Sequence, residues 1–215
     1  MVLTLFTTPR KIPEIVLGFF LIDFYEYCGS VNLDTLTKGD HIKNKIALLI
    51  ATWFYSGLIP PVILKGMAGT YGSFFSIPLC YLLLITEQKI GLSYGFVTIL
   101  IFLLGLWCVS KAEISLGPRT DWKNKTKSRD QNQIVIDETF GVLITCYPLT
   151  LINFNSYWLV LGIAFVLFRF FDIVKVPPTK YFDNMKNAFG VMFDDFVAGI
   201  YSAIMLTILV LVLKL

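Results

Sequence analysis

The sequence predicts an all-α membrane protein, a polytopic helical bundle of about five apolar helices with an interfacial helix near the N-terminus. Three observations favour this class. Hydrophobic residues make up 56% of the 215 positions and charged residues only 15%. Mean hydropathy is +0.71, and the apolar residues come in blocks separated by short polar segments. Since soluble domains are less apolar and carry more charge, an integral membrane protein is expected.

The longest apolar block, residues 196–213, contains no charge. Eighteen helical residues reach roughly 27 Å, about the thickness of the hydrocarbon core of a bilayer. Shorter blocks precede it, and the predicted spans are 73–86, 90–110, 139–153, 156–171 and 196–213. The segment 46–64 is also apolar, but Gly57 and the pair Pro60–Pro61 interrupt it. Because proline breaks a helix, a bent or re-entrant segment is predicted there.

The first 49 residues are expected to form an N-terminal extension, and residues 50–215 a membrane-embedded domain. The apolar run Ile15–Ile22 has eight residues and no small-residue cleavage site after it. It is too short to span a bilayer and does not resemble a signal peptide, so an interfacial helix is predicted. Residues 31–45 are polar and are expected to form a connector.

Composition also narrows the function. A net charge of +3 gives little support for nucleic-acid binding, so no nucleic-acid partner is expected. The four cysteines lie in or beside apolar segments without C-x-x-C spacing, and we expect reduced thiols that pack as small hydrophobic side chains rather than a disulfide framework or a zinc site. They are Cys28, Cys80, Cys108 and Cys146.

The basic residues predict the orientation in the membrane. The polar segment 111–133 is rich in lysine and arginine, and such loops lie in the cytoplasm. With the predicted spans, only Lys89 and Lys214 among the basic residues fall on the opposite face. The same arrangement brings four polar clusters from distant parts of the chain to the cytoplasmic face, which is difficult to explain as independent solvated helix ends.

Two of these clusters are pairs of adjacent acids before apolar blocks, Asp137–Glu138 and Asp194–Asp195. Two like charges at a membrane surface call for a neutralising cation, and a divalent metal facing a phosphorylated lipid head group would supply it. The alternative is that the acids begin helices, where the helix dipole favours negative charge.

The third cluster places Arg169, Asp172 and Lys175 at i, i+3 spacing on one helix face. An intrahelical salt-bridge ladder is the simpler interpretation. The fourth cluster, residues 65–73, has three glycines among Lys65, Thr70 and Ser73. It suits a loop whose backbone N–H groups approach an anion ahead of a helix, although a flexible turn explains it equally well.

Together the clusters predict a magnesium phosphatase site. Mg²⁺ takes about six oxygen ligands and commonly joins carboxylates to substrate phosphate. Adjacent helical residues point about 100° apart, so one acid of each pair is expected to bind metal and the other to orient water or a base. Thr70 or Ser73 would bind phosphate or act as the nucleophile in place of water. The predicted metal ligands are Asp137, Glu138, Asp172, Asp194 and Asp195, with Asp137, Glu138, Asp172 and Asp195 also catalytic. The predicted phosphate-binding residues are Lys65, Thr70, Ser73, Arg169 and Lys175.

Other phosphate chemistries are excluded by missing residues. The single histidine, His41, cannot be both nucleophile and acid of a histidine-dependent lipid phosphatase. The sequence also contains no D-x-D-x-T/V aspartyl nucleophile, no C-x5-R phosphate loop and no D-G-x2-A-R…G-x3-D-x3-D set of the alcohol phosphatidyltransferases.

Four motifs together resemble the phosphatidylglycerophosphatase A family of bacterial membranes. They are G-L-x-P…A-G-T-Y-G-S (57–73), I-V-I-D-E-x-x-G (134–141), F-R-x-F-D-I-x-K-x-x-P (168–178) and G-V-M-x-D-D-x-x-A-G (190–199). The resemblance covers about residues 50–213. Val176 stands where the family usually has the first proline of Pro-x-Pro, which puts the rigidity of that loop in doubt, and residues 1–49 lie outside it.

The resemblance implies an all-helical, magnesium-dependent hydrolase at the inner-membrane surface. Its phospholipid substrate would be phosphatidylglycerophosphate, converted to phosphatidylglycerol in phospholipid biosynthesis, with the site facing the cytoplasm. The sequence leaves the oligomeric state open. An alternative is a small ion- or proton-coupled transporter subunit, since acids within membranes are functional by default. That function favours carboxylates deep within spans and inverted repeats, and the sequence has no such repeats.

Overall fold

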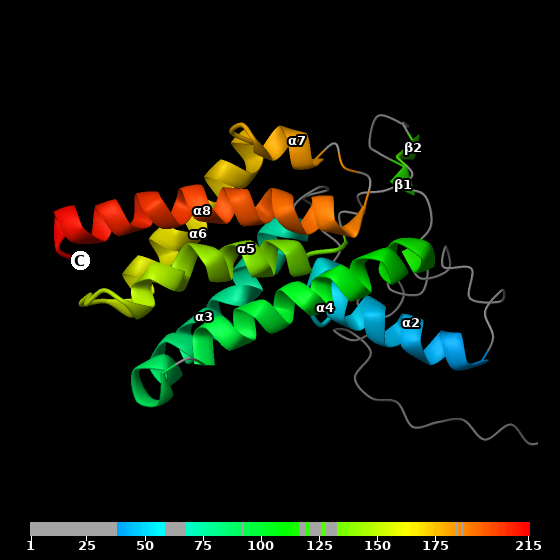
Figure 1. Ribbon diagram of the computed structural model, residues 1–215, viewed down its shortest axis with the longest axis horizontal. Coiled ribbons are helices and arrows are strands. Elements are labelled where there is room, and N and C mark those ends of the chain that lie inside the picture. Colours follow the sequence, from blue (N-terminus) through cyan, green and yellow to red (C-terminus); the bar gives the residue numbers. More distant parts are fainter. Residues whose placement is uncertain are drawn as a thin grey trace, which may run out of the picture.

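The computed structural model describes residues 38–58, 68–91, 93–116, 119–120, 126–127, 133–183, 185 and 187–215 (Figure 1). The predicted interfacial helix around Ile15–Ile22 lies outside these residues, as do Cys28 and Lys65. Within the described residues the secondary structure is helical except for one two-residue β ladder, so the predicted all-α class is confirmed.

The described residues form both long and short helices. In chain order they are α2 (Lys38–Ala51), the 3-10 helix η2 (Ser56–Leu58), α3 (Ala68–Ile90), α4 (Ser93–Leu116), β1 (Arg119–Thr120), β2 (Thr126–Lys127), α5 (Ile136–Cys146), the 3-10 helix η3 (Tyr147–Thr150), α6 (Tyr157–Val174), α7 (Thr179–Asp183) and α8 (Ala188–Leu213). Strands β1 and β2 are antiparallel, with Arg119 opposite Lys127.

Four helices of the described chain, α3, α4, α6 and α8, are long and apolar enough to cross a membrane. The fifth apolar helix, α5, corresponds to the predicted span 139–153 but has only 11 residues before η3 begins. Eleven residues rise roughly 16 Å, about half of a hydrocarbon core. The predicted count of about five apolar helices therefore holds, although one of them is shorter than a span.

Helix α5 lies inside the bundle, in contact with α3, α4, α6 and α8 (Figure 1). Val142 and Leu143 on it are fully buried. Glycines bring it close to α8, because a Cβ on Gly199 would lie 2.7 Å from the backbone oxygen of Gly141. A Cβ on Gly141 would in turn overlap the ring of Phe168 on α6. The short helix is thus fixed among longer ones, which also fixes the position of its first turn.

Helix α2 differs from the expectation for residues 31–45, because residues 38–45 are helical rather than a polar connector. Ala47 and Ala51, one turn apart, are fully buried, whereas Lys43 and Lys45 are exposed. The helix packs against α4 through this alanine face. The break in 46–64 was predicted at Gly57 and Pro60–Pro61, and the proline pair lies outside the described residues. In the described part the helix ends earlier, at Ala51, and Trp53, Phe54 and Tyr55 have φ of 46°, 55° and 66°. The division at residue 49 into extension and domain stays a prediction.

The connection between α3 and α4 also differs in detail. The predicted spans 73–86 and 90–110 leave residues 87–89 for the turn, but α3 continues to Ile90, and Gly91 has φ of +63°. The Glu87 carboxylate accepts hydrogen bonds from the Ser93 hydroxyl (2.8 Å) and the Tyr94 backbone N–H (2.7 Å). A charged residue remains in the helix there because its side chain caps the next helix.

The cysteine prediction is confirmed for the described residues. Cys80, Cys108 and Cys146 are free thiols, and all three are buried. They pack in the hydrophobic core of the bundle, where a thiol behaves as a small apolar side chain.

Candidate metal and phosphate site

Three carboxylates from two helices meet at one end of α5. Asp137 and Glu138 lie in the first turn of α5, and Asp195 lies in α8. One oxygen from each of them falls within 4.8 Å of the others. Asp195 is 5% exposed. We call these three residues the acidic triad; oxygen ligands at such separations suit a divalent cation.

Asp194 and Asp195 do not lie at the start of their helix. Helix α8 starts at Ala188, where the Asn187 side chain accepts a hydrogen bond of 2.7 Å from the Gly190 backbone N–H. The two aspartates therefore lie about two turns inside the helix, beyond the terminal turn where the dipole is strongest. The helix-starting alternative is wrong for this pair. It does describe the location of Asp137 and Glu138.

The start of α5 is fixed from two neighbouring segments. The Val135 backbone N–H, at the N-cap of α5, donates a 2.9 Å hydrogen bond to the Ala51 carbonyl at the end of α2. A Cβ on Gly72 of α3 would overlap the Val135 side chain. Val135 is fully buried, so close packing here determines where the carboxylates of the next turn lie.

Glu138 is a member of the triad with an unsatisfied buried oxygen. Its Oε2 atom is buried and has no hydrogen-bond partner in the described structure. Burial, together with the neighbouring charge of Asp137, raises the pKa of Glu138 well above its ordinary value. Desolvation and like charge both disfavour a carboxylate, and a bound cation would remove both penalties. The site is therefore suited to positive charge.

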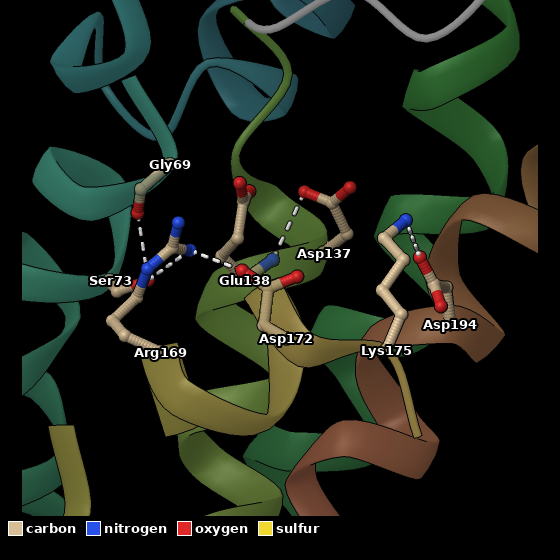
Figure 2. A network of polar contacts seen from close by, with 8 residues as sticks. All are labelled: Gly69, Ser73, Asp137, Glu138, Arg169, Asp172, Lys175 and Asp194. Carbon is tan, nitrogen blue, oxygen red and sulfur yellow. Dashed lines mark hydrogen bonds and ion pairs between the residues drawn. The ribbon is translucent and has the colours of Figure 1, made fainter. Parts of the chain in front are cut away.

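Arg169 of α6 borders the triad and is held from two sides (Figure 2). Its Nη1 is 2.7 Å from Oδ2 of Asp172, one turn further along the helix. The same nitrogen donates to the Ser73 hydroxyl at 3.4 Å, and that hydroxyl donates to the Gly69 carbonyl at 2.7 Å. The Nε atom of Arg169 is buried without a partner among the described residues. A guanidinium with an unused donor suits an anion such as phosphate.

Lys175 and Asp194 form a second ion pair beside the triad (Figure 2). Lys175 is the C-cap residue of α6, and its Nζ lies 2.8 Å from Oδ2 of Asp194 on α8. The predicted salt-bridge ladder is thus confirmed for its first pair, Arg169 and Asp172. Lys175 instead links two helices.

The structure therefore gathers most of the predicted site residues. Asp137, Glu138 and Asp195 form the triad, whereas Asp172 and Asp194 each pair with a basic residue. Ser73 contacts Arg169, and Thr70 is half-buried in the first turn of α3.

The glycine-rich stretch is a helix where it is described. A loop was expected up to Ser73, but α3 begins at Ala68. Small residues there serve side-chain packing instead, because a Cβ on Gly69 would overlap Oε1 of Glu138. Sequence reasoning missed Gly69 and Val135 as residues that shape the site. The glycine run was the available signal for the first, and nothing in the sequence distinguishes the second.

Comparisons with known proteins show the family of this chain. Residues 49–210 match the family model described as Phosphatidylglycerophosphatase A. Phosphatidylglycerophosphatase A of Haemophilus influenzae is 36% identical over 176 residues, covering 79% of this chain and 94% of that protein. Phosphatidylglycerophosphatase A of Escherichia coli K12 is 33% identical over 156 residues, covering 72% and 78%.

A third relative carries a different name. The "Putative phosphatidylinositol-3-phosphatase" of Bacteroides thetaiotaomicron is 34% identical over 166 residues, covering 76% of this chain and 92% of that protein. No solved structure gives a significant match. The family match extends over most of the chain, and four helices among the described residues are long and apolar enough to span a membrane. The enzyme prediction is confirmed over the transporter alternative, and the chain belongs to the phosphatidylglycerophosphatase A family of membrane phosphatases.

Proposed function

We propose that the chain hydrolyses the terminal phosphate monoester of phosphatidylglycerophosphate. The products are phosphatidylglycerol and inorganic phosphate, the step depends on Mg²⁺, and it belongs to phospholipid biosynthesis. The observation that carries the proposal is a pair of buried atoms without partners, Oε2 of Glu138 and Nε of Arg169. The first suits a cation and the second an anion, as a metal-assisted phosphatase requires. The names of two relatives support this substrate.

The donor set supports a hard divalent cation such as Mg²⁺. The acidic triad offers only carboxylate oxygens within 4.8 Å of one another. Hard oxygen ligands favour Mg²⁺, Ca²⁺ or Mn²⁺ over metals that prefer nitrogen or sulfur. Mg²⁺ also keeps several waters and shares its remaining positions with substrate phosphate, so three protein carboxylates are enough.

The acidic and the basic residues of the site have separate roles in this proposal. A magnesium ion, when bound, would polarise the phosphate and acidify a water molecule at neutral pH. Asp137, Glu138 and Asp195 would hold that ion, and Arg169 and Lys175 would bind phosphate oxygens and offset the charge that develops on them. The reaction breaks the bond between phosphorus and the glycerol oxygen. Water supplies the new oxygen of the released phosphate, and a proton passes to the departing alcohol.

Water is the favoured nucleophile over Ser73. The Ser73 hydroxyl donates to the Gly69 carbonyl and accepts from Arg169, so both of its hydrogen-bonding roles maintain the site. A serine nucleophile needs a general base as its hydrogen-bond acceptor instead. Ser73 therefore orients Arg169 in this proposal, and Thr70, in the first turn of α3, keeps its predicted place at the phosphate.

The proposed location is the cytoplasmic face of a bacterial inner membrane. The starts of α5 and α8 and the end of α4 lie toward one end of the bundle, opposite the C-terminus (Figure 1). The site lies at that end, and so do strands β1 and β2 after α4, which include Arg119 and Lys127 (Figure 1). Positive residues on this side favour the cytoplasm.

A phosphate-release assay tests the function. The purified protein in detergent is given phosphatidylglycerophosphate, phosphatidylinositol 3-phosphate or phosphatidic acid, with Mg²⁺ and then with excess chelator. Release is expected to be fastest from phosphatidylglycerophosphate and to stop with chelator. A full rate in excess chelator would contradict the metal requirement. No phosphate release from any of the three lipids would contradict the proposed phosphatase reaction.

The same assay tests a second candidate substrate. The name of the Bacteroides thetaiotaomicron relative favours phosphatidylinositol 3-phosphate as the alternative, because both lipids are phosphate monoesters on a lipid head group. A higher kcat/KM for the inositol lipid would replace our substrate while leaving the chemistry of the site unchanged.

A further inference from the structure

Two adjacent aspartates of α8 have different partners. Asp195 belongs to the acidic triad, whereas Asp194 lies 2.8 Å from Nζ of Lys175. Asp194 is 9% exposed as a residue, and Lys175 is half-buried. Since neighbouring residues on a helix point about 100° apart, the pair can serve two separate groups. One aspartate faces the metal position, and its neighbour faces a cation.

Lys175 has a backbone conformation that favours a different residue. It ends α6 with φ of 49° and ψ of 62°, and its N–H bonds the Phe171 carbonyl at 3.0 Å. Glycine is the usual residue at this left-handed position because it has no Cβ. A lysine that adopts it brings an ammonium group to the junction of α6 and α8. Backbone strain of this kind often accompanies a functional side chain.

The ion pair also argues against Asp194 as a metal ligand. An ammonium group 2.8 Å from Oδ2 competes with a metal ion for the same carboxylate. Asp194 is not a member of the acidic triad, although all four acids are described by the structure. Because Asp194 is adjacent to Asp195, its partner Lys175 meets α8 at the level of the acidic triad.

We infer that Asp194 is a positioning residue that holds the Lys175 ammonium for the substrate phosphate and does not bind the metal. The inference rests on the proposed function and assigns one further residue a role in it. An ammonium group has three N–H donors, so it can bond Asp194 and a phosphate oxygen at the same time. Asp194 acts on the substrate only through Lys175.

The first test separates metal binding from phosphate binding. Mn²⁺ prefers the same oxygen ligands as Mg²⁺, and the free ion can be measured by electron paramagnetic resonance. Asp194→Asn is expected to bind Mn²⁺ within about twofold of the wild-type affinity, whereas Asp195→Asn is expected to weaken it on the order of tenfold or more. Equal loss in both variants would overturn the inference, because Asp194 would then be a ligand too.

The second test follows inorganic phosphate as a competitive inhibitor. Removing a charge-assisted hydrogen bond is expected to weaken phosphate inhibition and raise KM on the order of tenfold in Asp194→Asn, with a smaller change in kcat. Lys175→Gly should show the same defect, and its fold should be retained because glycine suits the left-handed C-cap. Adding Asp194→Asn to Lys175→Gly should then change KM no further.

Thermal unfolding of the two single variants tests a purely structural role of the ion pair. If the ion pair merely joins α6 to α8, both single variants lower the unfolding temperature in detergent and leave phosphate inhibition unchanged, which overturns the inference. Asp194→Glu, which keeps the charge, should restore most of the KM if the inference holds. Failure of the proposed function looks different, because wild-type protein would then release no phosphate from the lipid. Binding of Mn²⁺ to the two aspartate variants would still decide the role of Asp194.

Discussion

The backbone of Gly69 on α3 lies directly against the carboxylate of Glu138 on α5. A Cβ at position 69 would overlap Oε1 of Glu138 and lie 3.2 Å from Nη1 of Arg169. The missing side chain therefore leaves room for an acid and a base from two other helices. Because this acid has a buried oxygen without a partner and this base a buried nitrogen without one, the contact lies where metal and phosphate would meet.

Gly69→Ala is expected to impair the site while leaving the bundle folded. The new methyl group must displace the Glu138 carboxylate, since helix backbone cannot move as easily. We expect kcat/KM to fall on the order of tenfold or more, because small misplacement of a catalytic group has large effects. Gly162→Ala is the matched control, since a Cβ there has nothing within 4 Å. Equal activity in the two variants would contradict the role of Gly69.

Asp195→Asn and Asp137→Asn are expected to remove most turnover. Each change takes a charged ligand from the acidic triad, and we expect a loss on the order of a hundredfold in kcat, as for lost metal-site groups. Glu113→Gln, which neutralises an acid of α4 outside the triad, is the control. Phosphate release and size-exclusion profiles should be compared together. Wild-type rates in both aspartate variants would rule out the proposed metal site.

Metal binding is expected to stabilise the folded protein. A ligand that binds only the native state adds about 2.7 kcal/mol at a concentration 100 times its Kd. Mg²⁺ should therefore raise the unfolding temperature of the wild type in detergent, and excess chelator should reverse the change. Asp195→Asn should show a much smaller increase at the same concentration. An identical increase in both proteins would indicate that Mg²⁺ binds elsewhere.

Gly199→Ala is expected to destabilise the bundle rather than the chemistry alone. A Cβ on Gly199 would lie 2.7 Å from the Gly141 backbone oxygen and 3.0 Å from Cβ of Ile144. Forcing α5 and α8 apart costs about 1–3 kcal/mol in well-packed cores. Gly95→Ala is the control, because its Cβ would be 3.8 Å from the Tyr147 ring, an ordinary contact. Thermal unfolding in detergent measures the difference, and equal unfolding temperatures would show that the helices adjust without cost.

Membrane orientation can be mapped with single cysteines. Tyr181 on α7 is 66% exposed and Leu151 after η3 is 82% exposed, so either position accepts a labelled cysteine. In intact cells, a membrane-impermeant thiol reagent should label Leu151→Cys and should reach Tyr181→Cys only after the membrane is opened. The reverse pattern would place the site outside the cytoplasm. Labelling of both positions from one side would contradict the topology.

The sequence by itself determined the apolar blocks, the acids and the family resemblance. These are local properties, because hydropathy and motif spacing are read directly along the chain. Four apolar segments are long helices, and the first acidic pair lies at a helix start as its position suggested. Helix ends were less accurate. A loop was predicted for residues 68–72 and the last span was predicted to begin only at 196, but packing in the bundle extends α3 and α8 through residues 68–72 and 188–195.

Only the tertiary structure decided which partners the acids have. Sequence spacing makes Asp194 and Asp195 equivalent, but the position of α6 gives the first a lysine, and the position of α5 gives the second two carboxylates. The same holds for Gly69, whose purpose appears only when Glu138 lies against it. Hydrophobicity determines which segments enter the membrane, whereas the rotation and depth of each helix follow from close packing between residues far apart in the chain.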